Sequence, residues 1–404
     1  MRVIHKSSPT NVAYCGIAID AGSRDENTSE FGIAHFCEHA LFKGTIHHSA
    51  RHIINRMEAV GGDLNAYTTK EETVVYAAFM KEHLDRAVEL IYDVVFNSTY
   101  PQKELDKEAE VIVEEIESYM DSPAELIFDE FENFLFKKHP LGHDILGCPQ
   151  QIRTYTTEKL QQFTKRLYKP ENTIFFIFGD YNTEQIKKSL SKVTDVQSIE
   201  TNEKKNPKKN KRNSNIQLPT SFCHILQKEV HQAHVMMGCR AYPSYSNKRV
   251  AIYFLNNIIG GPGMNSLLNV ALREKRGLVY TVESNLTNYT DTSTFSIYFG
   301  CDANDVEKCV RIVKQELNLL ATTCMSEKKF KAALKQIKGQ IGVACDNFEN
   351  YALDMAKSFL HYHKFEGVKE TFEQLDALTP AILQQVAQEL FTDLSILIYQ
   401  PKNS

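Results

Sequence analysis

The sequence predicts an α+β protein built from two homologous α/β-sandwich-like domains. They are two copies of one duplicated unit, and each has a mainly antiparallel sheet with helices packed on it. Three observations support this fold class. A chain of 404 residues is longer than one ordinary domain. Strand-like and helix-like segments recur in the same order in both halves, at an offset of about 222 residues. A polar, basic segment at residues 200–215 separates the halves and has the composition of a linker.

The first half begins with a strand at residues 12–22, where apolar and polar side chains alternate. A helix within residues 31–45 follows, and Ser49 caps a second helix that runs through Ala59 and stops at Gly61 and Gly62. The same criteria predict strands at 72–80 and 173–179 and helices at 83–96, 101–120, 123–136 and 156–168.

The second half repeats this order. Its segments pair with those of the first half as follows: 234–241 with the first strand, 306–320 with the helix at 83–96, 379–386 with 156–163, and 394–401 with 173–180. The predicted domains are therefore residues 1–199 and 216–404, joined by the linker at 200–215. A nucleic-acid-binding or targeting role for the basic linker is the alternative interpretation.

The stretch FGIAHFCEHALFKGT at residues 31–45 carries the strongest chemical signal. His35 and His39 are at positions i and i+4, so both imidazoles lie on one face of a helix, about one turn apart. Two histidines with a carboxylate and an open fourth position form a common catalytic zinc site. Glu38 lies on the same side and is placed to accept a proton from water at such a site. A chance cluster of polar residues on a surface helix is the alternative.

A third ligand is sought in the helix at 101–120. Glu108 and Glu115 are about two turns apart, close beside the apolar stripe of that helix. A carboxylate beside a buried stripe is costly unless a positive group pairs with it. The other acidic side chains are expected to face solvent, namely Glu110, Glu114 and Glu117.

Together these segments resemble the pitrilysin/insulinase (inverzincin) metallopeptidases, in particular the two-domain type of the mitochondrial processing peptidase subunits. The resemblance implies one Zn²⁺ per chain bound by His35, His39 and Glu115. It also implies Glu38 as the general base and Glu108 as a carboxylate that supports the site. The surrounding match comprises Gly32, Ala34, the Phe42–Thr45 segment, Gly62, the Asn65–Thr68 segment and Glu72–Thr73.

One position departs from the family pattern. Cys37 stands where a large aliphatic residue is usual, and it points away from the two histidines. We interpret it as a core substitution and not as a metal ligand.

The second half lacks the zinc motif, because at the repeat offset His35 falls on Asn257, and Glu38 and His39 fall on Gly260 and Gly261. It carries instead a Gly-rich turn followed by Arg273 and Tyr280. The resemblance implies that this pair binds the substrate backbone near the scissile bond. It also implies that Asn65 and Ala66 belong to an edge to which a peptide is added as a strand.

In the large four-domain relatives of that family, the zinc site and the Arg/Tyr pair lie in the first and last domains. A two-domain chain therefore needs a second chain, and a homodimer, or a heterodimer with a paralogue, is expected. The expected function is a zinc-dependent endopeptidase that hydrolyses short or unfolded peptides in a closed chamber. The alternatives are a non-catalytic or partner-dependent subunit of a heteromeric processing peptidase, and a peptide-binding module that retains zinc.

Composition limits the other classes. The N-terminal residues hold no apolar core of signal-peptide length, and no apolar run approaches the length of a membrane span. Nine cysteines, an odd number without a CxxC pair, indicate buried reduced thiols and a reducing compartment. A cytoplasmic location is therefore expected. The net charge is -5, and neither a nucleic-acid nor a membrane partner is expected.

Overall fold

The computed structural model describes residues 1–194, 199–200 and 221–402. They form two compact units, each described below by itself. The first unit comprises Met1–Ser118, the described residues of 143–200, and Cys345–Phe365. The second comprises Tyr119–Gly142 and the described residues of 221–344 and 366–402. Apart from its first residue, the predicted linker lies outside the described residues.

The first unit contains a six-stranded sheet in the order β3-β4-β2-β5-β1-β6. Neighbours from β3 through β5 are antiparallel, whereas β1 is parallel to both β5 and β6. The strands are β1 (Arg2–Ser7), β2 (Val12–Ile19), β3 (Asp63–Thr68), β4 (Thr73–Met80), β5 (Thr173–Gly179) and β6 (Ile199–Glu200).

The second unit repeats this topology in a five-stranded sheet, with order β7-β11-β8-β10-β9. Here β7 is parallel to β11, and the other neighbours are antiparallel. The strands are β7 (Cys223–Lys228), β8 (Ala233–Ala241), β9 (Val279–Asn288), β10 (Ser293–Cys301) and β11 (Ser395–Pro401). The strands β7 to β11 thus take the places of β1, β2, β3, β4 and β5, which confirms the predicted duplicated α+β fold.

Helices cover one face of the first sheet and enclose its main core with the inward side chains of β2, β4 and β5. At the start of α2 the Ser49 hydroxyl accepts a hydrogen bond from the His52 amide N–H, so Ser49 caps the helix as the sequence predicted. These helices are α1 (Ile33–Leu41), α2 (Ala50–Glu58), α3 (Leu84–Phe96), α4 (Gln102–Met120), α6 (Pro149–Ile152), α7 (Thr157–Leu167) and α8 (Thr183–Leu190).

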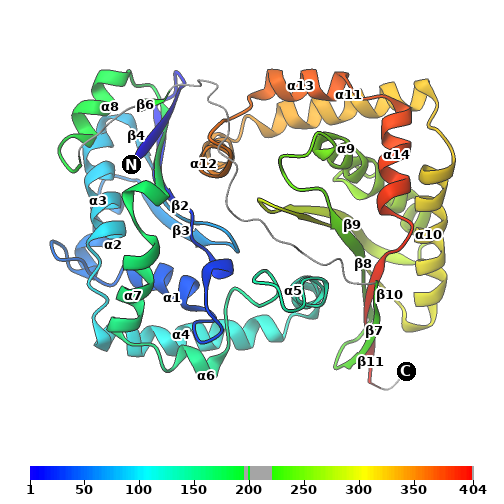
Figure 1. Cartoon of the computed structure of the whole chain (residues 1–404), viewed down its shortest axis with the longest axis horizontal. Coiled ribbons are helices and arrows are strands. Elements are labelled where there is room, and N and C mark those ends of the chain that lie inside the picture. The colour runs from blue at the N-terminus through cyan, green and yellow to red at the C-terminus, as the bar shows by residue number, and fades with distance from the viewer. Residues whose placement is uncertain (195–198, 201–220, 403–404) are drawn as a thin grey trace. The chain divides into compact units, whose positions relative to one another are not determined.

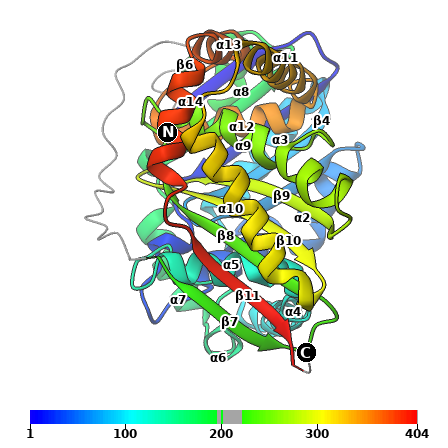
Figure 2. The same ribbon diagram turned by 90° about the vertical axis from the view of Figure 1, so that its right-hand side faces the viewer.

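The second sheet has an equivalent helical layer. Figure 2 shows α10 and α14 lying side by side across its strands. The layer consists of α9 (Arg249–Gly260), a π-helical turn η4 (Asn269–Glu274), α10 (Val306–Thr322), α11 (Glu327–Ala344), α13 (Val368–Asp376) and α14 (Pro380–Leu390).

Two helices are exchanged between the halves of the chain. α12 (Phe348–Tyr362), from the second half, covers the other face of the first sheet, so that α3 and α12 lie on opposite sides of its strands (Figure 1). Its buried side chains Ala352, Met355, Ala356, Phe359 and Leu360 pack on Ile4, Ala18, Val74, Ile174, Phe176 and Phe178. Reciprocally, α5 (Pro123–Leu135), from the first half, packs on β8 and β11 of the second sheet.

The compact units therefore differ from the contiguous ranges 1–199 and 216–404 expected from the sequence. The periodicity of α5 and α12 shows that each has an apolar face, but periodicity does not indicate which sheet that face covers. Strand β1 and helix α8 were also missed. β1 is too short to show a clear alternation, and α8 is mostly polar outside Ile186 and Leu190.

The cysteines and the helices agree only in part with the expectations from composition. All nine cysteines are free, and Cys15, Cys37, Cys301 and Cys309 are buried, but Cys223 and Cys324 are exposed. Among the described residues, no helix is long and apolar enough to cross a membrane.

The exchanged helix α12 makes a testable contribution to stability. Phe359 is 3% exposed in the cluster between α12 and the first sheet. We expect Phe359→Ala to lower the free energy of unfolding by about 3–5 kcal/mol, because it removes a buried ring and leaves a cavity. Denaturant unfolding would measure the loss, and hydrogen exchange would locate it in β5. Asn350→Ala on the exposed side of α12 is the control, and an equal loss in both variants would contradict the assignment.

Candidate metal centre

Helix α1 presents the two histidines of the motif on one face. The His35 and His39 ring centroids are 4.6 Å apart, with the rings edge to face. Cys37 is fully buried on the core side of the same helix. The helix thus separates its core face from a polar face, as the spacing of the motif predicted.

Helix α4 brings a carboxylate to these imidazoles. One Glu115 oxygen lies 3.8 Å from His35 Nε2, and the other lies 3.6 Å from His39 Nε2. One ligand atom from each residue can be chosen so that all three lie within 4.8 Å of one another, the only such group found among the described residues. Ligands at about 2.0–2.1 Å from a tetrahedral zinc ion are themselves about 3.3 Å apart, so small side-chain adjustments would close this set around an ion.

The second nitrogen of His39 is already held in the arrangement of a metal ligand. Its Nδ1 lies 2.9 Å from Glu108 Oε1, while Lys43 Nζ lies 2.5 Å from Glu108 Oε2. A carboxylate at Nδ1 keeps the proton on that nitrogen and leaves the Nε2 lone pair directed toward Glu115. Glu108 is buried, and Lys43 supplies the positive charge that such a carboxylate needs.

The two histidines differ in their protonation. Burial, with the neighbouring His39, lowers the pKa of His35 to about 3, so that His35 is neutral and its lone pair is available at neutral pH. For His39, burial also disfavours the charge, but the Glu108 hydrogen bond and the charges of Glu38, Glu108 and Glu115 together raise its pKa. Burial of Glu108 is outweighed by the hydrogen bonds and charges of His39 and Lys43, which lower the pKa of its carboxyl group, so Glu108 stays charged and accepts the Nδ1 proton of His39.

Glu38 lies between the histidines and strand β3. Burial raises the pKa of its carboxyl group, whereas hydrogen bonds from the side chain and backbone of Thr68 and the charge of His39 partly oppose that shift. A carboxylate with a raised pKa is a better proton acceptor than an exposed one. Sequence reasoning missed the contacts that Thr68 and Lys43 make, although both residues lie inside the matched segments.

Strand β3 forms an edge of the first sheet, with β4 as its one neighbour in the sheet order. Asn65 and Ala66 lie in the middle of this strand, with Asn65 exposed and Ala66 partly buried. An edge strand leaves backbone groups open for pairing, so a peptide can be added there as a further strand, next to Thr68 and Glu38.

The corresponding positions in the second unit hold other residue types. At the repeat offset His35 falls on Asn257 of α9, whose side-chain amide donates to Gln340 of α11 over 2.8 Å, and Glu115 falls on the buried Ile337. The counterpart of His39 is Gly261, where α9 has already ended. None of the three residues at these positions, Asn257, Gly261 and Ile337, is a usual zinc ligand.

Arg273 and Tyr280 are brought together within the second unit. Arg273 ends in a guanidinium 5.5 Å from the Tyr280 ring centre, a cation–π contact. Arg273 lies in the π-helical turn η4, and Tyr280 near the start of β9 is 84% exposed. Exposure of this size leaves the phenol free to bind a ligand, and π-helical turns often occur at functional sites.

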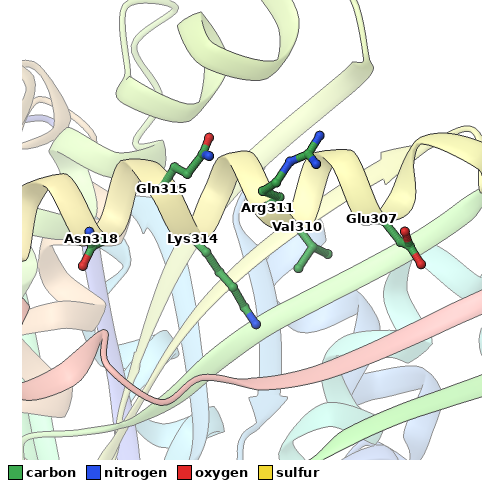
Figure 3. A pocket seen from close by; sticks show the side chains of 6 residues that line it. All are labelled: Glu307, Val310, Arg311, Lys314, Gln315 and Asn318. Atoms are coloured by element: carbon green, nitrogen blue, oxygen red, sulfur yellow. The ribbon is translucent and has the colours of Figure 1, made fainter.

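A hollow on the surface of α10 is a separate feature (Figure 3). In Figure 3 Lys314 and Val310 point to one side of the helix, and Arg311 and Gln315 point to the other. All of its lining residues come from this one helix, whereas ligand sites usually combine polar groups from several elements. The candidate centre is therefore the His35/His39/Glu115 group.

Two known protein families match successive parts of the chain. Residues 2–149 match the family described as insulinase (peptidase family M16), and residues 154–337 match the family described as peptidase M16 inactive domain. An "uncharacterized zinc protease" of Bacillus subtilis is 28% identical and aligns over 100% of this chain and 97% of its own length. A protein of the same description from Rickettsia bellii is 31% identical over 95% of this chain and 90% of its own.

A solved structure described as a protease from Helicobacter pylori has a similar fold. It aligns with a TM-score of 0.85 at 22% identity and covers 98% of this chain and 96% of its own.

Proposed function

This chain belongs to the insulinase family of peptidases (peptidase family M16), and we propose that it is a zinc-dependent endopeptidase that hydrolyses short or unfolded peptides. The observation that carries the proposal is the convergence of His35, His39 and Glu115 beside the partly buried carboxylate of Glu38. A structural role would not require three ligand atoms to meet next to a proton acceptor. The zinc in the names of the relatives is consistent with the ligand set.

In this mechanism His35, His39 and Glu115 would hold the ion, and Glu108 with Lys43 keeps the His39 proton on Nδ1, so that Nε2 can bind a metal. When bound, zinc supplies a Lewis acid that polarises the scissile carbonyl and makes a water molecule more acidic. Glu38 accepts a proton from the attacking water and returns it to the leaving amine. The substrate backbone extends the first sheet at the β3 edge, where Asn65 and Ala66 lie.

The direct test is digestion of a peptide mixture by the purified single-chain protein, with products read by mass spectrometry. We expect internal cleavages that stop when zinc is removed by a chelator and return when zinc is restored. A protein that contains zinc but cleaves no peptide unless another chain is added would support the alternative, a partner-dependent subunit. If the protein neither binds zinc nor cleaves peptides, the result would support the alternative of a non-catalytic subunit.

The ligand set makes a separate prediction. Glu115→Gln is expected to weaken zinc binding at least about tenfold, because the site loses its anionic ligand while both imidazoles remain. Metal analysis after dialysis against a graded chelator would measure the effect. Glu114→Gln removes the same charge from the exposed side of α4 and is the control. Full zinc occupancy in the Glu115 variant would assign the third ligand elsewhere.

We further propose that the working enzyme is a dimer, either of two identical chains or with a paralogue. The resemblance to the four-domain relatives supports this proposal, since it implies that Arg273 and Tyr280 act on a substrate at the zinc site of another chain. Both residue sets occur in this sequence, so two copies would contain everything that two sites require.

A further inference from the structure

Besides Glu108, a second buried carboxylate lies close to the candidate metal centre, at the start of α1, and it has no part in the mechanism above. Glu26 has a fully buried side chain that is anchored by three hydrogen bonds. Its Oε1 accepts the Ala34 amide N–H at 2.9 Å, and its Oε2 accepts the Gly32 amide N–H at 3.0 Å. Oε2 also lies 3.1 Å from His143 Nε2. Glu26 therefore binds the first turn of α1, the helix that carries both histidines.

The start of α1 needs such an anchor. Its N-cap is Gly32, which has no side chain to accept the free amides of the first turn. A carboxylate brought in from the preceding loop supplies that acceptor and places a negative charge at the positive end of the helix. Ala34, one of the two residues it holds, directly precedes His35.

The segment that contains His143 packs closely around the same turn. The His143 ring stacks on Phe31 at 4.1 Å between centroids, and the Tyr155 hydroxyl donates to the Phe31 carbonyl at 2.8 Å. Gly32 has a positive φ of 88°, and a Cβ there would lie 2.6 Å from the Leu146 carbonyl oxygen. The backbone at the start of α1 therefore has little freedom to shift.

The two ligand histidines are positioned in different ways. His39 is oriented through its own ring by Glu108, whereas Nδ1 of His35 is buried and has no hydrogen-bond partner among the described residues. No hydrogen bond at Nδ1 therefore fixes the orientation of the His35 ring. That orientation depends instead on where the first turn of α1 lies, and Glu26 binds two amides of that turn.

We propose that Glu26 is a positioning residue for the metal centre. It holds the first turn of α1 through the Gly32 and Ala34 amides and thereby orients the imidazole of His35. His143 holds the Glu26 carboxylate in place. The inference rests on the proposed function, because it requires that His35 bind zinc.

The test compares Glu26→Gln with Glu30→Gln. The Glu26→Gln change keeps the shape of the side chain, but the new amide group turns a donor toward one of the three N–H groups. Glu30 lies in the same loop, but its side chain binds Asn27 and Arg166 and not the amides of α1. Two quantities are measured for each protein: the rate at which zinc is lost to a chromophoric chelator, and the denaturant midpoint of the metal-free form.

We expect zinc to leave the Glu26→Gln protein roughly tenfold faster than the wild type, the size of effect seen when support around metal ligands is lost. Glu30→Gln should match the wild type. The Co²⁺-substituted Glu26→Gln protein should also show altered visible absorption bands, which a general loss of stability would not produce. His143→Ala leaves both hydrogen bonds from the amides to Glu26 in place, so its rate of zinc loss should rise by less than that of Glu26→Gln.

Two results would overturn the inference. If Glu26→Gln releases zinc at the wild-type rate, Glu26 does not position the site, whatever happens to the unfolding midpoint. If Glu26→Gln does not fold, the His143→Ala protein decides the question. A wild-type rate of zinc loss from that protein would show that Glu26 does not position the site. A wild-type protein that binds no zinc would instead overturn the proposed function, and this inference with it.

Discussion

Glu38→Gln is expected to leave zinc bound and to lower peptide turnover by at least about 10³-fold, within the range attributed to general acid–base catalysis. Glutamine matches the carboxylate in size and can still accept a hydrogen bond from Thr68. It cannot take a proton from water, so the hydrolytic step loses its base. Because Glu38 is not one of the three converging ligand residues, metal content should stay at the wild-type level.

Turnover of a fluorogenic peptide, measured together with the zinc content of the same samples, tests this expectation. Glu117→Gln on the exposed side of α4 removes the same charge away from the site and should keep full activity. Comparable turnover in Glu38→Gln and wild type would exclude the mechanism. Loss of zinc from Glu38→Gln would show that Glu38 supports the ligands and not only the proton transfer.

The second large effect concerns the proposed dimer. Glu38→Gln protein and an Arg273→Ala/Tyr280→Ala protein should each be nearly inactive alone. In a heterodimer of the two, one of the two composite sites combines an intact Glu38 with an intact Arg273/Tyr280 pair. An equal mixture after free exchange contains half heterodimers, so about a quarter of the wild-type activity should return.

Subunit exchange has to be established first, with two differently tagged wild-type proteins purified in sequence through both tags. A mixture of Glu38→Gln protein with Glu38→Gln/Arg273→Ala/Tyr280→Ala protein contains no intact Glu38 and therefore no complete composite site, and it is the control. If exchange occurs and the first mixture stays inactive, the active site is built within one chain or with a different protein.

The sequence was sufficient for the parts of the molecule that depend on local spacing. His35 and His39 are one helical turn apart in any α-helix, so their common face followed from the motif alone. Glu108 and Glu115 share one face of α4 for the same reason, and the repeat predicted the second sheet from the first. The roles of these residues remain predictions that the variants above address.

Other features depend on contacts that no local pattern contains. Glu26 meets α1 through backbone amides, and a carboxylate that binds amides has no spacing signature. His143 reaches Glu26 from a distant part of the chain, through a short segment that carries no periodicity. The exchange of α5 and α12 escaped prediction because an amphipathic helix fits either of two similar sheets, and the choice depends on complementary side-chain shapes.

The exchange of α12 has a consequence for the order in which the protein can be made. The last large strand of the first sheet, β5, ends at Gly179, but the helix that covers its second face ends at Tyr362. A ribosome that adds about 5–20 residues per second needs roughly 9–36 s to synthesise the roughly 180 residues between those points. During that interval the apolar face with Phe176 and Phe178 has no cover on the nascent chain. The first unit therefore completes its folding only after α12 has been synthesised, long after the strands that α12 covers.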